Sequence, residues 1–113
     1  MSINSRITTA LDGLTNGTAA ADTYKGREAE YIVFNYSMIP ADFGDDDAGH
    51  YRALVQVHLY APHEKNTVAL RRKIKAAITA AGFTRPSVTP ASDERGQHYV
   101  FEFEDVEAVE EAE

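Results

Sequence analysis

Apolar and polar residues alternate most strictly between Tyr51 and Tyr60, in the run YRALVQVHLY. The odd positions of this run are all apolar, and the even positions are mainly polar, with Leu54 and Tyr60 as exceptions. A period of two is typical of a β-strand that buries one face. Because ten residues is long for a strand of a small domain, we expect this strand to lie in the middle of an antiparallel sheet.

Further segments share this alternation. Tyr31 to Tyr36 carries Ile32, Phe34 and Tyr36 on one face and is the expected partner of the central strand, and His98 to Glu104 forms a closing strand. Shorter strands are predicted to end at Tyr24 and to run from Ser87 to Thr89, where prolines limit the length. Met38 to His50, which is rich in Asp and Gly, is predicted to form a long polar loop.

Two segments follow a helical period instead. Apolar residues spaced by three and four predict a helix from about Ile3 to Leu14, with Ser2 or Asn4 as its N-cap. A second helix is predicted after Asn66 and ends at Gly82. We therefore predict an α+β fold in which an antiparallel sheet of about four strands carries both helices on one face.

The opposite face of that sheet is only partly polar. Covering one face with helices leaves Leu54, Tyr60 and Val100 on the other, together with the Tyr31 side of its strand. Apolar and aromatic area of this kind often marks a subunit interface. The candidate interface residues are Tyr31, Arg52, Leu54, Gln56, His58 and Tyr60, with the two tyrosines as the preferred anchors.

Charge is distributed unevenly along the 113 residues. Residues 102–113 hold seven carboxylates, which account for the whole net charge of −7. We therefore expect one α+β domain over residues 1–104 and an acidic, flexible tail over residues 105–113. Without a basic patch on the body, the chain lacks the electrostatic footprint of a protein that grips nucleic acid.

Composition excludes further classes. The chain has no cysteine, hence no disulfide or thiolate metal site, and we find neither a signal-peptide pattern nor an apolar run near the roughly 20 residues that span a bilayer. Folding in the cytoplasm is expected.

Histidines and aspartates are the candidate metal ligands of this chain. His50, His58, His63 and His98, with Asp45, Asp46 and Asp47, supply the residue types for such a site. His50 and His58 would lie roughly 26 Å apart on an ideal strand, too far to share an ion. The aspartate run lacks the twelfth-position glutamate of a calcium loop. We expect no metal site and no cofactor, and no catalytic motif is present.

Four segments together resemble a known family. They are YKGREAEYIVFNYS, YRALVQVHLYAPHEKN, RRKIKAAITAAGF and TRPSVTPASDERGQHYVFEFE, within residues 18 to 104. They are similar to small tail-completion or tail-terminator proteins of long-tailed (siphovirus-type) phages and prophages.

The resemblance implies a structural role in the virion rather than an enzymatic one. Such proteins form a ring, usually a hexamer, that caps the tail tube, stops its growth and joins it to the head connector, and DNA passes through the lumen without specific binding. Assembly would occur in the host cytoplasm, with the protein ending at the head–tail junction. The loop carrying Asp42, Asp45, Asp46 and Asp47 would contact a partner or the lumen. The alternative is a small α+β ligand- or metal-binding domain, or an enzyme of unknown substrate.

Overall fold

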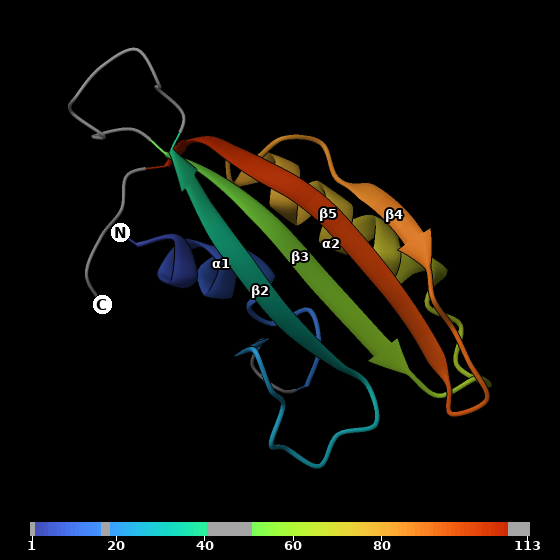
Figure 1. Ribbon diagram of the computed structural model, residues 1–113. Helices are drawn as coiled ribbons and strands as arrows, with labels where there is room; N and C mark the ends of the chain where they lie inside the picture. Colours follow the sequence, from blue (N-terminus) through green and yellow to red (C-terminus); the bar gives the residue numbers. More distant parts are fainter. Residues whose placement is uncertain (1, 17–18, 41–50, 109–113) are drawn as a thin grey trace.

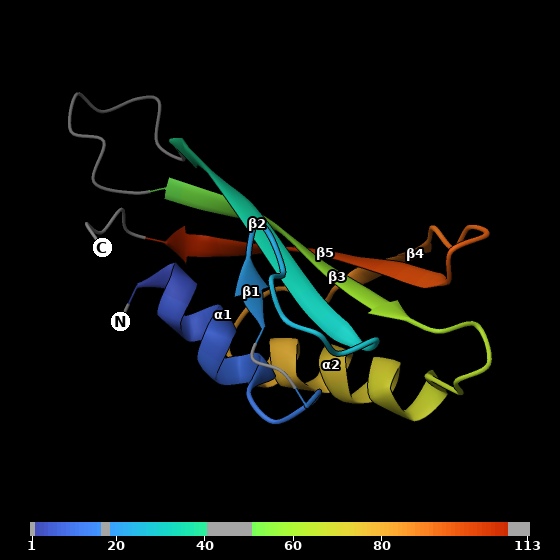
Figure 2. The same ribbon diagram turned by 90° about the horizontal axis from the view of Figure 1, so that it is seen from below.

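The structure is a computed structural model that describes residues 2–16, 19–40 and 51–108, with no side-chain description for residues 40, 51 and 106–108. Its elements follow the order α1 (Ile3–Leu11), β1 (Ala20–Ala21), β2 (Tyr31–Pro40), β3 (Tyr51–Ala61), α2 (Val68–Ala80), β4 (Ser87–Pro90) and β5 (Gln97–Ala108). Figure 1 shows the long strands side by side. Figure 2 shows both helices on the same side of the sheet. The predicted α+β class is confirmed.

The sheet of the described residues has five strands, in the order β1-β2-β3-β5-β4, rather than about four. A short strand, β1, lies where one is predicted to end at Tyr24, but it ends at Ala21, and its two residues pair in parallel with Val33 and Phe34. β3 lies in the middle, antiparallel to β2 on one side and to β5 on the other, as its alternation predicts. β4 closes the far edge against β5.

One core fills the space between the sheet and the helices. The odd residues of β3 from Ala53 to Leu59 are at most 1% exposed, and Phe34 and Phe101 flank them on the neighbouring strands. From the helices, Ile7, Ile74 and Ile78 complete this cluster. The face of the sheet that the alternation assigns to the interior is therefore the face that the helices cover.

Local signals explain where the helices begin and end. Ser2 caps α1, because its Oγ accepts a hydrogen bond of 3.2 Å from the Ser5 N–H. α1 ends at Leu11 rather than near Leu14, since Asp12 is extended and Gly13 has a φ of +78°. Before α2, Asn66 Oδ1 accepts from the Val68 N–H at 3.0 Å, and Gly82 follows the helix with a φ of +93°.

The strand β2 extends further than the sequence predicts. β2 continues through Met38, Ile39 and Pro40, which pair with Ala53, Arg52 and Tyr51, so the predicted loop begins later. The rest of that loop, with Asp42, Asp45, Asp46, Asp47 and His50, lies outside the described residues.

The predicted boundary between domain and acidic tail is wrong. β5 runs on to Ala108, and Asp105 is only 6% exposed. Its carboxylate pairs with the guanidinium of Arg6 on α1, and Arg6 also lies over the Phe83 ring, 4.6 Å from its centroid. Asp105 can be buried in this domain because the ion pair with Arg6, from a helix distant in the sequence, compensates its charge.

Candidate interaction surface on the open sheet face

The face of the sheet opposite the helices, named the open face below, is uncovered by any other described element (Figure 2). Register and alternation assign its residues: Tyr31, Val33, Asn35, Ser37 and Ile39 from β2; Arg52, Leu54, Gln56, His58 and Tyr60 from β3; His98, Val100, Glu102 and Glu104 from β5; Ser87 and Thr89 from β4. All six predicted interface residues lie on this face.

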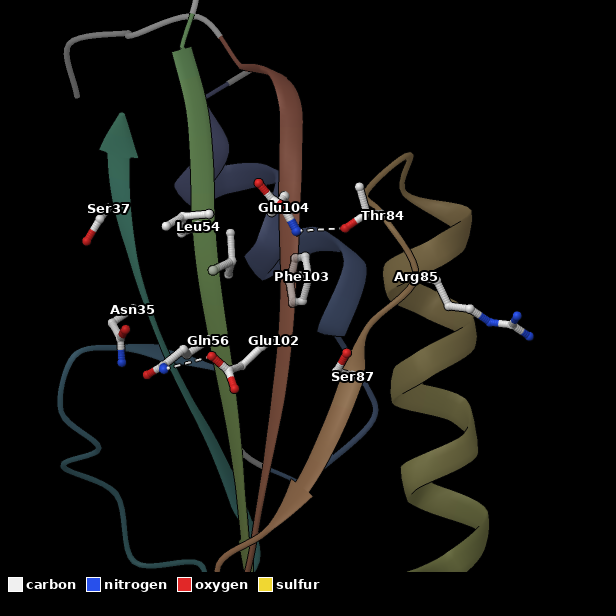
Figure 3. Close-up of a pocket in the computed structure, with 11 residues that line it drawn as sticks. Asn35, Ser37, Leu54, Gln56, Thr84, Arg85, Ser87, Glu102, Phe103 and Glu104 are labelled. Atoms are coloured by element: carbon white, nitrogen blue, oxygen red, sulfur yellow. Dashed lines mark hydrogen bonds between the residues drawn. The ribbon is translucent and has the colours of Figure 1, made fainter. Parts of the chain in front are cut away.

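One end of the open face is polar, with two exposed large apolar side chains, Leu54 and Ile39. Figure 3 shows Leu54, Gln56, Glu102 and Glu104 around a hollow of about 540 Å³. Gln56 Nε2 donates to Glu102 at 3.3 Å, and the Arg52 guanidinium contacts Glu104 Oε1 at 2.6 and 2.8 Å. Leu54 remains 39% exposed between these pairs. This end combines satisfied charges with an uncovered leucine.

The other end carries a row of aromatic rings, named the ring ladder below. Tyr24 stacks on Tyr31 with 4.3 Å between ring centroids, Tyr31 stacks on Tyr60 at 5.0 Å, and Tyr60 stacks on His98 at 4.3 Å. The ladder therefore crosses β2, β3 and β5, and each ring restrains its neighbour. Rings fixed in this way lose little rotational entropy on binding a partner.

His58 joins the ladder through His98. His58 Nδ1 lies 2.9 Å from His98 Nε2, and His58 Nε2 lies 3.3 Å from the Asn35 side-chain amide nitrogen. If the amide donates to Nε2, His58 carries its proton on Nδ1 and donates it to His98. The two imidazoles then share a single proton between their facing nitrogens.

Both imidazoles favour the neutral form. Burial lowers the pKa of His58 below its ordinary 6.5, and the adjacent His98 lowers it further, while Glu102 opposes the shift. Burial also lowers the pKa of His98, against the opposing effect of Asp93. Burial raises the pKa of the Tyr60 hydroxyl above 10.0, with smaller contributions from Tyr31 and Asp93. At neutral pH this end of the open face is therefore uncharged at its centre.

A second hollow, of about 390 Å³, opens beside the ladder. Tyr31, Tyr60 and His98 line it together with Asp93 and Arg95 of the β4–β5 turn. The charged turn residues thus lie at the rim of an aromatic surface, an arrangement in which a polar rim surrounds apolar contacts.

The sequence pattern does not predict the contact between His58 and His98. Alternation predicts the two strands that carry these histidines, but spacing along one strand relates His58 only to His50, which lies outside the described residues. The pair arises across strands: His58 lies opposite Val100 and His98 opposite Tyr60, which makes the histidines diagonal neighbours. A search for polar even positions on both strands would have found them.

The described part of the chain lacks two further kinds of feature. No group of three or more His, Asp or Glu side chains there is placed to hold a metal ion. Among the described residues, no helix is both long and apolar enough to cross a bilayer.

Comparison with known proteins adds no identification. No protein-family model matches the chain, and no curated protein matches it significantly.

Proposed function

We propose that this protein is a ring-forming structural component of a phage tail, a terminator or completion protein that caps the tail tube and joins it to the head connector. The open face is the proposed contact between neighbouring subunits. Tail tube protein and head connector are the further partners, and DNA passes through the lumen without being bound specifically.

The observation that carries this proposal is the uncovered, aromatic and apolar character of the open face. Leu54 and Ile39 are 39% and 37% exposed, and the ladder tyrosines accompany them on the same face. Aromatic residues are enriched at the centres of protein interfaces, where they carry much of the binding energy. A second subunit would remove this area from water.

The two-layer architecture favours a ring over a two-fold dimer. One side of the domain is helical and the other is an open sheet, so the domain presents two unlike faces (Figure 2). A contact between unlike surfaces is heterologous, and heterologous contacts close into rings when the rotation per subunit permits. The resemblance of residues 18 to 104 to tail-terminator proteins supports the same geometry.

The basic residues of α2 fit this role as well. Arg71, Arg72, Lys73 and Lys75 lie close together on a helix that contains no acidic residue, whereas the open face carries Glu102 and Glu104 against Arg52. Opposite charge on two unlike faces favours head-to-tail contacts and disfavours the contact of like faces.

The test compares two variants that place the same charge on different layers. Leu54→Glu puts a carboxylate in the centre of the open face, and Val68→Glu puts one at the start of α2, where Val68 is 43% exposed. Native mass spectrometry and pull-down with purified tail tubes would measure assembly. We expect Leu54→Glu to lose ring formation and tube capping while its fold is retained, and Val68→Glu to weaken assembly as well, because α2 lies on the side of the domain that would meet the open face of the next subunit.

Tube capping is the more decisive readout, because a subunit can be monomeric before it meets the tube. A wild-type protein that neither assembles nor associates with tail tubes would contradict the proposed function. A Leu54→Glu variant that caps tubes as well as wild type would remove the open face as the contact.

A further inference from the structure

His58 and His98 bring two imidazole nitrogens together on an accessible surface. His58 Nδ1 and His98 Nε2 are 2.9 Å apart, and the ring centroids are separated by 5.1 Å at an angle of 31°. Neither ring is fully buried. Two imidazole nitrogens this close share one proton in a hydrogen bond, and without that proton both nitrogens offer a lone pair.

The geometry is close to that of two ligands on one metal ion. With metal–nitrogen bonds of roughly 2.0–2.1 Å and a tetrahedral angle, the two nitrogens would lie roughly 3.3 Å apart. The observed 2.9 Å therefore needs to open by only about 0.4 Å, which small side-chain rotations can supply. Imidazole nitrogen is a preferred ligand of zinc, copper and nickel, whereas calcium and magnesium prefer oxygen.

The neighbours of the pair fit a cation-binding role. Asn35 contacts the second nitrogen of His58 at 3.3 Å, and with its amide turned by half a rotation its oxygen would accept the N–H that a metal-bound His58 carries there. The stack of Tyr60 on His98 fixes the second imidazole.

Charge around the pair is mixed but includes a carboxylate for each imidazole. Burial is the largest effect on the pKa of both imidazoles and disfavours positive charge, whereas Glu102 of β5 acts on His58 and Asp93 of the β4–β5 turn acts on His98 in the opposite direction. Arg95 of the same turn lines the hollow beside His98 and opposes them. Tyr60 stacks on His98, and Tyr31 in turn stacks on Tyr60.

We propose that His58 and His98 form a binding site for a late first-row transition-metal dication such as Zn²⁺, which they hold through His58 Nδ1 and His98 Nε2. Because the described residues supply no group of three protein ligands, water completes the coordination. The site is contained within one chain and does not depend on the proposed ring.

The experiment is a titration of tag-free protein with ZnCl₂ at neutral pH. Isothermal titration calorimetry measures the stoichiometry and affinity, and NMR of the histidine ring nitrogens shows which nitrogens bind the metal. We expect one Zn²⁺ per chain and selective shifts of His58 Nδ1 and His98 Nε2. His58→Gln and His98→Gln should each weaken binding by at least about tenfold. His63→Gln is the matched control, because His63 is an exposed histidine that follows β3 outside the pair, and it should bind as wild type does.

The NMR shifts are measured on the wild-type protein, so the proposal stays testable even if a variant fails to fold. It is overturned if no stoichiometric binding occurs, if the shifted nitrogens belong to His50 or His63, or if the double variant His58→Gln/His98→Gln binds Zn²⁺ as wild type does. Loss of ring assembly with Zn²⁺ binding intact would count against the proposed function alone.

Discussion

Arg6 and Asp105 connect three parts of the fold through one ion pair. Arg6 belongs to α1, Asp105 to β5, and the Arg6 guanidinium also contacts the Ala81 carbonyl oxygen after α2 at 3.4 Å. The side chain of Asp105 is 7% exposed and that of Arg6 is 30% exposed. A pair with this little solvent around the carboxylate is costly to break from one side, because the remaining charge loses its partner.

Replacing Asp105 by Ala is therefore expected to lower the free energy of unfolding by about 1–3 kcal/mol, measured by urea denaturation. Glu104→Ala is the control, since Glu104 is the preceding residue on the opposite face and pairs with Arg52, whose side chain is 50% exposed. That change should cost no more than about 1 kcal/mol. Equal losses in both variants would contradict the structural role of the pair.

The histidine pair is expected to make stability depend on pH. The pKa of each imidazole is lowered in the fold, so the unfolded chain binds more protons below the ordinary value of 6.5. Stability is therefore fully present above about pH 6.5 and falls as the pH decreases through the folded-state values. Melting temperatures measured with a metal chelator present should fall more steeply toward acid for wild type than for His58→Gln/His98→Gln. Parallel curves would contradict this expectation.

Strand existence could be predicted from the sequence, whereas strand ends could not. Alternation identified β3 and its two long neighbours because every second residue there enters the core. The sequence does not predict the ends of β2 and β5, because proline is typical of turns and aspartate of exposed segments, and Pro40 and Asp105 lie near these ends. In the fold Pro40 lies opposite Tyr51 and Asp105 meets Arg6, and both contacts join residues that are distant in the sequence or separated by a loop.

Two truncations test the corrected end of the domain. Removing residues 109–113, whose sequence VEEAE holds three carboxylates, should change the melting temperature by less than about 2 °C. Removing residues 105–113 deletes the end of β5 and the partner of Arg6, and should lower the melting temperature by at least about 5 °C. Circular dichroism measures the melting temperatures. Equal values for the two truncated chains would support the sequence-based prediction that the domain ends at residue 104.

At the scale of the whole molecule, one core connects both helices to the sheet. Phe101 is 0% exposed in the centre of this core, and Val100, the residue before it, lies half-buried on the open face. Phe101 and Val100 are adjacent in the same strand, one buried and one on the surface. Alanine substitutions at the two positions therefore distinguish the loss of core packing from the loss of strand propensity.

Phe101→Ala should reduce the free energy of unfolding by about 3–5 kcal/mol, because it leaves a cavity at the centre of the core. Val100→Ala should cost less than about 1.5 kcal/mol. Urea denaturation followed by far-ultraviolet circular dichroism and by tyrosine fluorescence should give coincident transitions for both variants. Separate transitions would show that α1 or α2 unfolds independently of the sheet.

The open face could be predicted from the sequence in outline but not in detail. Alternation placed Leu54 and Tyr60 on it, because residues of one parity share one side of a strand. The ring ladder and the histidine pair depend on which residue of β5 lies opposite which residue of β3, and on Tyr24 folding back over Tyr31. Such register is set by the packing of the whole sheet.

Pro90 limits how the sheet can grow. The Ala91 N–H donates inward to the His98 carbonyl at 2.7 Å, so the residues of β4 alternate and the N–H at position 90 would point outward, toward the free edge. Proline has no such donor, and Val88 is the only non-proline residue of β4 with its N–H on that side. A strand of another molecule therefore finds a poor template at β4, which disfavours edge-to-edge aggregation through this edge of the sheet.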